Sequence, residues 1–525
     1  MTPTISRFVK YPQRAMNAIE FVRAFDIEKI RMNSSMPNGS KSLLYMKNML
    51  NAFAFLSTVV LALCGCASDK TCLHASKSPK PTPQQAAWQD AELGMFIHFD
   101  LEVFNDDETN SDVRGNTNRP SYGAIPVSKF NPTKLDTDQW LETAKALGAN
   151  YAVFTAKHGT GFLMWQSDLY PYGVKQSSWR DGQGDVVQDF LASCKKYGVE
   201  PGIYCSAGGH AWWNLHHGEV RMRKGILSGN TNDIENFINM DLAMYQDLFK
   251  KTGPLFYIWL DGGVNPLGDR IIPIIAKYEA NAVVFNGPSN GVPAGLARWS
   301  GNEKGAAPYP LWNTINISND QLDRGAGDPD GKYWVPVEGN VPLRYHQWFW
   351  RPDNENKILS LSSLMSMYLA TVGHGANFII NANIGPDGLI PDADVQRFKE
   401  FGDTIRKWFG TSIAETSGKG ETVELKLPQP QEINFVMIME DIRQGQRIRN
   451  YEVDGLVDGT WKKLCDGESV GHKRIQEFDR TEVSAIRLKV TKDVAEPLIR
   501  KLAVYNIETL PPDPNDPVNK PGVAP

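Results

Sequence analysis

Two acidic side chains have the sequence surroundings of catalytic carboxylates. Asp261 ends the apolar run Leu255–Leu260 and precedes two glycines, and Glu303 lies in a polar segment with aromatic and basic neighbours. An isolated Asp-Gly is more often only a turn, so the elements around Asp261 decide its interpretation. A pair of carboxylates at one aromatic-lined site is typical of glycoside hydrolysis, in which one attacks the anomeric carbon and the other protonates the leaving oxygen.

Glu338 is a second candidate for the proton-transferring residue. The sequence around it, Trp334–Glu338, predicts a polar loop near tryptophan, and the same holds for Glu303. Residue type and surroundings therefore leave the choice between the two glutamates open.

Three further polar side chains close apolar runs elsewhere in the chain. They are His98, His158 and Tyr204, and neutral imidazoles at one shared mouth could bind sugar hydroxyls. His98, Asp100 and His158 could alternatively hold a metal ion. The chain has no helical His-x-x-x-His or tight His-x-His spacing there, so we do not predict a metal site.

The elements that must position these residues alternate between strand and helix, which favours a parallel sheet. Eight strands are predicted, and that number favours a (β/α)8-like TIM barrel. A doubly wound sheet would instead show a Gly-rich turn after its first strand, which is absent from this sequence. The predicted strands are Gly94–Phe99, Asn150–His158, Glu200–Ser206, Leu255–Leu260, Asn281–Asn286, Ala297–Ser300, His346–Trp350 and Ala376–Asn383. The predicted helices are Asp138–Leu147, Asp185–Tyr197, Asn236–Lys251 and Asp269–Tyr278.

The chain divides into six predicted segments. Residues 85–410 form the barrel, and residues 411–510, with period-two alternation and β-branched residues, form a β-sandwich. Residues 511–525 are a Pro-rich tail that we expect to be disordered. Residues 1–45 are an unassigned extension, residues 46–65 a lipoprotein signal peptide, and residues 66–84 a Ser-, Lys- and Pro-rich tether.

The N-terminal apolar segment predicts export to a bacterial cell envelope. It ends at Leu63–Cys66, which resembles a lipobox with Cys66 as the lipidated residue, although an ordinary signal peptide is the alternative. Met46 is the predicted initiator. We expect a periplasmic or outer-membrane lipoprotein whose only membrane contact is this anchor.

The amino-acid composition limits the classes of molecule that the protein is expected to bind. A formal net charge of -5 gives no basic field for nucleic acid. The 14 Trp, 17 Tyr and 23 Phe residues fit a large core together with sites that stack on sugar faces. Cys72, Cys194, Cys205 and Cys465 lack metal-ligand spacing and are taken as structural, with their disulfide state and the oligomeric state left open.

Eight ordered motifs resemble the α-L-fucosidases of glycoside hydrolase family 29, most closely the branch specific for α-1,3/1,4-linked fucose. The similarity runs from Ala91 to Phe409, and the motifs are Met95–Phe99, Phe130–Asp136, Thr155–Phe162, Gly184–Val187, Gly202–Ser206, Ile258–Gly263, Arg298–Glu303 and Trp334–Glu338. The resemblance implies a barrel with a C-terminal carbohydrate-binding-like sandwich, a retaining exo-mechanism on fucosylated glycans, and no metal or organic cofactor.

The resemblance also implies roles for single residues. Asp261 matches the family's nucleophile and Glu303 its acid/base. His98, His158, Tyr204 and Trp259 match the family's fucose-contacting positions. We further expect substrate contacts from Glu108, Trp165 and Arg298, and we take Glu338 as a substrate-side or supporting residue.

Two departures from the family pattern affect the sugar more than the chemistry. Gly159 stands where the family has a second histidine, and the family's Glu-Trp pair is represented at best by Glu108–Thr109. The alternatives are therefore an α-L-galactosidase or related glycosidase, a branched fucosyl substrate, or a surface glycan-binding lipoprotein with weak catalysis.

Overall fold

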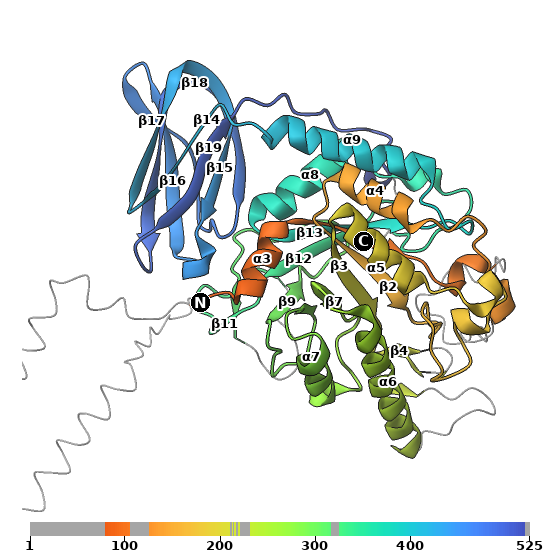
Figure 1. The fold of residues 1–525 in the computed structure, drawn as a ribbon. Helices are drawn as coiled ribbons and strands as arrows, with labels where there is room; N and C mark the ends of the chain where they lie inside the picture. The colour runs from red at the N-terminus through yellow and green to blue at the C-terminus, as the bar shows by residue number, and fades with distance from the viewer. Residues whose placement is uncertain are drawn as a thin grey trace, which may run out of the picture. The chain divides into compact units, whose positions relative to one another are not determined.

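The computed structural model describes residues 79–105, 125–210, 213, 215–216, 219–220, 231–316 and 325–519. Their main feature is a closed barrel of eight parallel strands, followed by antiparallel strands that form a separate C-terminal domain (Figure 1). The prediction of a TIM-like barrel followed by a β-sandwich is confirmed.

The barrel strands pair in the order β1-β13-β12-β9-β8-β7-β3-β2. Their bounds are β1 Leu93–His98, β2 Tyr151–Lys157, β3 Glu200–Cys205, β7 Tyr257–Trp259, β8 Val283–Phe285, β9 Leu296–Trp299, β12 Val337–Pro342 and β13 Asn377–Asn383. Small sheets outside the barrel are β4 Gly209–His210, β5 Leu215–His216 and β6 Glu219–Val220, and β10 Thr314–Ile315 with β11 Tyr333–Trp334.

One predicted barrel strand is wrong. Residues 346–350 are not a strand, and the seventh strand is β12, which is buried along its whole length. Its sequence, with Glu338, Gly339, Asn340 and Pro342, has neither an apolar run nor β-branched enrichment, so propensity alone could not identify it. As a consequence Glu338 lies inside a strand and not in a polar loop.

Helices cover the outside of the barrel, and their ends follow local sequence signals. The Asp136 carboxylate accepts hydrogen bonds from the amides of Asp138 and Gln139 at the start of one helix, which ends at Gly148 with a φ of 89°. The helices are α3 Pro83–Ala91, α4 Thr137–Leu147, α5 Val186–Tyr197, α6 Thr231–Thr252, α7 Ile272–Tyr278, α8 Leu361–Thr371 and α9 Asp392–Phe409.

The inside of the barrel is packed with aromatic rings. Trp88 on α3 closes the end where the strands begin, and its ring lies 5.3 Å from that of Tyr257. Phe96, Tyr204 and Trp259 fill the other half. The interior is therefore a solid core, and chemistry is left to the loops at the carboxyl ends of the strands.

The C-terminal domain pairs its strands in the order β14-β19-β15-β18-β16-β17 around an apolar core of its own. Its two longest strands change register part-way, for example between Lys426 and Gln431, which lets one strand serve both layers of a sandwich. The bounds are β14 Ala414–Lys419, β15 Thr422–Glu440, β16 Ile448–Val457, β17 Thr460–Gly467, β18 Arg474–Asp493 and β19 Leu498–Tyr505.

An ionic cluster joins this domain to the first barrel strand. Glu92, directly before β1, accepts a 2.7 Å hydrogen bond from His472 and pairs with Lys473. Burial raises the pKa of Glu92, but Lys473 and His472 outweigh it and hold the pKa at about 2. Glu92 is therefore a carboxylate at neutral pH, held by residues from the other domain.

The Pro-rich tail is ordered as far as residue 519, contrary to the sequence expectation. The carboxylate of Asp516, which is 2% exposed, accepts a 2.9 Å hydrogen bond from the amide of Ser360. Cys194, Cys205 and Cys465 are free thiols. The predicted signal peptide, the tether up to residue 78, Cys66, Cys72 and Glu108 lie outside the described residues.

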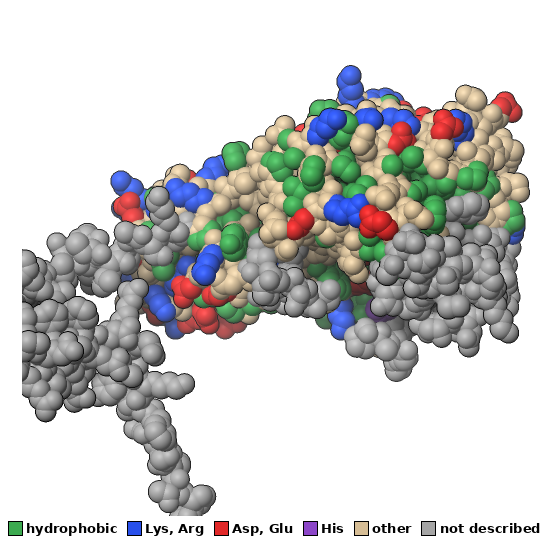
Figure 2. Space-filling view, turned by 90° about the horizontal axis from the view of Figure 1, so that it is seen from below, with side chains coloured by type: hydrophobic (Ala, Val, Ile, Leu, Met, Phe, Trp, Pro, Cys, Tyr) green, Lys and Arg blue, Asp and Glu red, His purple; other side chains and the backbone are tan. Residues whose placement is uncertain are grey.

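The face shown in Figure 2 has Lys and Arg side chains interspersed with Asp and Glu. Within the part of the chain that the structure describes, every helix is either too short or too polar to cross a bilayer.

Candidate active site

Asp261 stands at the mouth of the barrel, directly beyond β7. Gly262 and Gly263 follow it with φ values of 68° and 83°, a conformation that lets the chain turn sharply and that other residues rarely adopt. The hydroxyl of Tyr204 donates a 2.8 Å hydrogen bond to Oδ2 of Asp261. The carboxylate is exposed, so one oxygen is oriented by tyrosine while the group stays accessible from the mouth.

Tyr204 ties Asp261 to two more of the predicted residues. Its ring lies nearly parallel to that of His158, at 5.4 Å and 18°, and to that of Trp259, at 5.4 Å and 19°. Burial, followed by the charge of Asp261, raises the pKa of Tyr204 well above its usual range. Tyr204 therefore remains protonated and serves as a hydrogen-bond donor.

His98 and His158, at the ends of the adjacent strands β1 and β2, lie side by side at the mouth with ring centroids 5.8 Å apart. Nδ1 of His98 is 2.7 Å from the side-chain oxygen of Asn381 on β13. Burial and the nearby His158 hold the pKa of His98 well below its usual range, so its imidazole is neutral at pH 7. Nδ1 of His158 is buried, and among the described residues no group bonds to it.

Asp100 lies just behind the two histidines. It is fully buried and accepts two 2.8 Å contacts from the hydroxyl of Thr160. Burial raises the pKa of Asp100 to about 6, against the opposing effects of His158 and Thr160. Among the described residues, no three His, Cys, Asp or Glu side chains are grouped as they would be around a metal ion.

Glu303 reaches the mouth from the loop after β9. Its Oε2 accepts a 3.1 Å hydrogen bond from the indole of Trp348, which comes from the loop after β12. The Trp348 ring lies 5.1 Å from that of His98, and its carbonyl accepts hydrogen bonds from the side chains of Asn381 and Asn383. The structure thus brings Glu303 together with the histidine side of the site.

Trp348, Asn381 and Asn383 are site residues that the sequence analysis missed. Trp348 was assigned to a strand that does not exist. Asn381 and Asn383 stand at alternate positions of a strand whose other residues, apart from Asn377, are apolar, and that pattern is a usable signal for polar groups directed to one face.

Glu338 does not lie at the mouth. It is fully buried inside the barrel, where Oε1 accepts a 2.8 Å hydrogen bond from Nε1 of Trp259 and Oε2 a 3.1 Å bond from the hydroxyl of Tyr151. Burial raises the pKa of Glu338 to about 7, opposed by these hydrogen bonds. Because Glu338 is enclosed inside the barrel, it is not placed to protonate a leaving oxygen at the mouth. Of the two predicted roles, substrate-side or supporting, this position fits the supporting one.

Two other predicted substrate contacts lie away from the mouth. Arg298 is buried and donates to the backbone carbonyls of three residues, Val335, Gly325 and Trp312, which fixes the surrounding loops. Trp165 is 1% exposed and donates its indole hydrogen bond to Asp247. Alternation along β9 directs Trp299 into the barrel and Arg298 outward.

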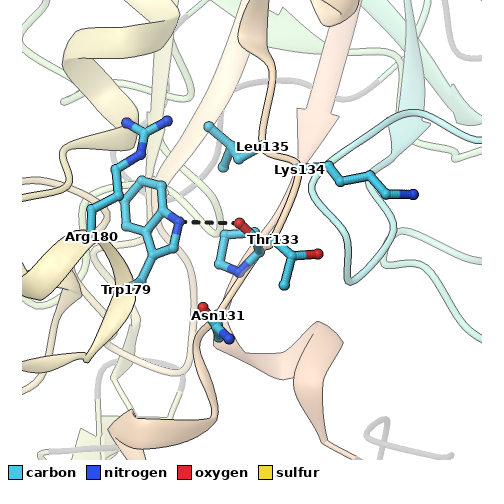
Figure 3. Close-up of a pocket in the computed structure, with 7 residues that line it drawn as sticks. Asn131, Thr133, Lys134, Leu135, Trp179 and Arg180 are labelled. Carbon is cyan, nitrogen blue, oxygen red and sulfur yellow. Dashed lines mark hydrogen bonds between the residues drawn. The ribbon is translucent and has the colours of Figure 1, made fainter.

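The pocket in Figure 3 contains none of the candidate residues. Trp179 donates a 3.1 Å hydrogen bond to the carbonyl of Pro132 there, and its charged residues are paired, Arg180 with Asp189 and Lys134 with Asp387. The pocket is lined by Asn131, Pro132, Thr133, Lys134, Leu135, Trp179 and Arg180.

Comparison with known proteins decides the family. The protein-family model with the description alpha-L-fucosidase matches residues 62–408 of this chain. The chain belongs to the α-L-fucosidase family. The resemblance to glycoside hydrolase family 29 is thereby confirmed, and the protein is a glycoside hydrolase of that family.

Relatives of this family cover most of the chain. Alpha-L-fucosidase 1 of Arabidopsis thaliana is 28% identical over an aligned length of 477 residues, and the alignment covers 81% of this chain and 87% of the plant protein. The crystal structure of a candidate α-L-fucosidase from Bacteroides thetaiotaomicron is 38% identical with a TM-score of 0.75, covering 82% of this chain and 100% of that one. A glycoside hydrolase 29 family member from an unknown rumen bacterium is 28% identical with a TM-score of 0.71, covering 84% and 79%.

Proposed function

We propose that the protein is a retaining exo-glycosidase that removes terminal α-L-fucosyl residues from glycans by double displacement. The observation that carries this proposal is the Tyr204–Asp261 hydrogen bond, which presents one oriented and accessible carboxylate at the barrel mouth of a fucosidase-family protein. Glu303, held by Trp348, supplies the second carboxyl group.

In the first step the carboxylate of Asp261 attacks the anomeric carbon. The bond from that carbon to the leaving oxygen breaks, and Glu303 transfers its proton to this oxygen. The product is a glycosyl ester on Asp261 and a free acceptor sugar. In this proposal the sugar binds against His98, His158 and Tyr204 and above the indole of Trp259, which packs on Phe285 at 4.2 Å.

In the second step Glu303, now a carboxylate, takes a proton from water. The water oxygen attacks the anomeric carbon and the ester bond to Asp261 breaks, which restores both carboxyl groups and retains the anomeric configuration.

The test replaces Asp261 by glycine. Asp261→Gly should abolish turnover of an aryl α-L-fucoside, and added azide should restore turnover with a glycosyl azide as product. Asp353→Gly is a matched control because it removes an exposed carboxylate at a φ of 56°, where glycine fits, and it should behave as wild type. Near-normal hydrolysis by Asp261→Gly would exclude the assignment of the nucleophile.

A second candidate substrate class is favoured by the surroundings of Gly159. No atom lies within 4 Å of the point where a side chain would begin at this position, next to His158. This open space could accept a sugar that is larger than fucose, such as an α-L-galactoside with its additional hydroxyl, or a branched glycan. A panel of aryl α-glycosides, assayed for both turnover and binding, distinguishes fucosidase, galactosidase and a weakly catalytic binding protein. Gly159→His should narrow the range of sugars accepted.

We also propose that the protein is exported and anchored to the bacterial envelope by lipid on Cys66. The support is the apolar segment that ends at Leu63–Cys66. Cys66→Ser should move the protein from the membrane fraction to the soluble fraction of its host and prevent labelling with a radioactive fatty acid. Labelling that persists would exclude Cys66 as the acceptor.

A further inference from the structure

Glu338 is a carboxyl group that is buried inside the barrel, between its two ends. Burying such a group is costly unless hydrogen bonds satisfy it, and both of its oxygens are satisfied. The two donors differ in position. Tyr151 is the first residue of β2, at the closed end of the barrel, whereas Trp259 is the last residue of β7, two positions before Asp261.

The Trp259 bond leads directly toward the catalytic carboxylate. The indole is stacked on Phe285 at 4.2 Å and 12° and lies nearly parallel to the ring of Tyr204. Tyr204 in turn donates to Asp261. Stacked rings can slide within their common plane with little loss of contact, and the Nε1 hydrogen bond to Glu338 is the one directional contact of the indole among the described residues.

We propose that Glu338 is a positioning residue, which fixes the indole of Trp259 in its plane and thereby holds Tyr204 and Asp261 in register under the sugar. The inference rests on the proposed function for its kinetic readout. What it requires of residue 338 is an acceptor oxygen at the position of Oε1 and not a charge or a transferable proton.

The neighbours of Glu338 support this role. Inside the barrel it faces the hydroxyl groups of Tyr151 and Tyr257 and the indole of Trp259, and no Lys or Arg pairs with it among the described residues. Arg298, on the adjacent strand, points to the outside. Glu338 therefore forms no ion pair with any residue that the structure describes, and the shorter of its two hydrogen bonds comes from Trp259.

Two substitutions separate positioning from charge. Glu338→Leu fills the space but has no acceptor, and kcat on an aryl α-L-fucoside should fall about 10- to 100-fold, with KM changed less than about 3-fold, because small displacements of reacting groups have effects of this size. Glu338→Gln keeps an acceptor for Trp259 and can donate to Tyr151, so kcat should stay within about 3-fold and the pH profile should be unchanged. If Glu338→Leu does not fold, Glu338→Met is the second variant, since its flexible side chain fills irregular space.

A double-mutant cycle tests whether the effect passes through the indole. Trp259→Phe removes the donor, so in that background Glu338→Leu should change kcat by less than about 3-fold. Tyr151→Phe removes the other hydrogen bond of the same carboxyl group and should leave kcat within about 3-fold. An equal loss of kcat from Glu338→Leu in both backgrounds, or a Glu338→Gln variant as inactive as Glu338→Leu, would overturn the proposal.

A second measurement does not depend on activity. In protein labelled with 15N at tryptophan, the indole N–H signal that Trp259→Phe removes should persist in Glu338→Gln and shift upfield in Glu338→Leu. If the wild type hydrolyses no fucoside, the proposed function fails while this signal still tests the positioning. If the chemical shift of this indole N–H signal were the same in wild type, Glu338→Gln and Glu338→Leu, the positioning role of Glu338 would be refuted and the proposed function would be unaffected.

Discussion

Replacing Glu338 by glutamine should make folding stability less sensitive to pH. The pKa of Glu338 is about 7 in the folded protein, against an unperturbed 4.5. Below pH 4.5 the carboxyl group of Glu338 is protonated in both the folded and the unfolded protein, so it does not change the free energy of unfolding. Between 4.5 and 7 the unfolded chain loses the proton while the folded barrel keeps it, so stability falls as pH rises. Above pH 7 the folded barrel holds the ionised carboxylate, and the free energy of unfolding is lowered by the full cost of burying this charge.

The size of this effect follows from the two pKa values. Each pKa unit corresponds to about 1.4 kcal/mol, so the ionised group costs the wild type about 3 kcal/mol at high pH, of which roughly three quarters develops between pH 5 and pH 8. Glutamine has no such cost, and it keeps both hydrogen bonds by accepting from Trp259 and donating to Tyr151. Glu338→Gln should therefore be close to wild type near pH 4 and more stable by about 3 kcal/mol above pH 8.

Urea unfolding, followed by tryptophan fluorescence at a series of pH values, measures this difference directly. Other buried carboxyl groups are present in both proteins, so their contributions cancel in the difference in unfolding free energy between wild type and Glu338→Gln. Glu440→Gln is the contrasting variant, because both oxygens of Glu440 accept from backbone amides, of Arg447, Ile448 and Gly471, and an amide nitrogen cannot. It should be less stable than wild type even at low pH. If the difference in unfolding free energy between Glu338→Gln and wild type did not change with pH, the reasoning would be refuted.

Three further predictions concern single contacts. Trp348→Phe removes the donor to Glu303 and should lower kcat/KM by about 10-fold for fucosides with poor leaving groups and less for activated aryl fucosides, measured as a leaving-group series; equal losses across the series would contradict a role in proton transfer. Gly161→Ala should lower the melting temperature by several degrees, because this residue has a φ of 82° and an added Cβ would lie 2.4 Å from the His210 ring; an unchanged melting temperature would contradict that geometry. Asp136→Ala should cost about 1 kcal/mol in urea unfolding through loss of the α4 cap, without a change in kcat.

Much of the site could be predicted because it lies on strongly patterned strands. Asp261, His98, His158 and Tyr204 each lie at or within two residues of the end of an apolar strand, and parallel strands carry such residues to a common mouth. Glu303 required the family resemblance, since polar loops give no directional signal.

The errors share a physical cause. Glu338 and Arg298 look alike in sequence, as charged residues near tryptophan, but strand alternation sends one into the barrel and the other out of it. Arg298 lies in a predicted strand, Ala297–Ser300, but the pattern of that short strand does not show which face is directed inward. The direction of Glu338 cannot be read before its strand is recognised, and β12 is a strand because its neighbours β9 and β13 pair with it and not because of its own propensities. Pairing between strands that are far apart in the sequence leaves no signal in the local sequence pattern.

The ionic cluster at Glu92 restricts how this protein can be divided. A barrel truncated after residue 410 would keep Glu92 and lose His472 and Lys473, leaving a carboxylate without its partners at the root of the strand that ends in His98. Removing the sandwich would also uncover Glu92, whose side chain is 19% exposed in the intact chain, so the truncated barrel would not hold a buried unpaired charge. A foreign sandwich that covered Glu92 without a cation would create one, at a typical cost of about 3 to 5 kcal/mol, a large part of the stability of a domain. A chimera that joins this barrel to another sandwich must therefore bring a cation to Glu92.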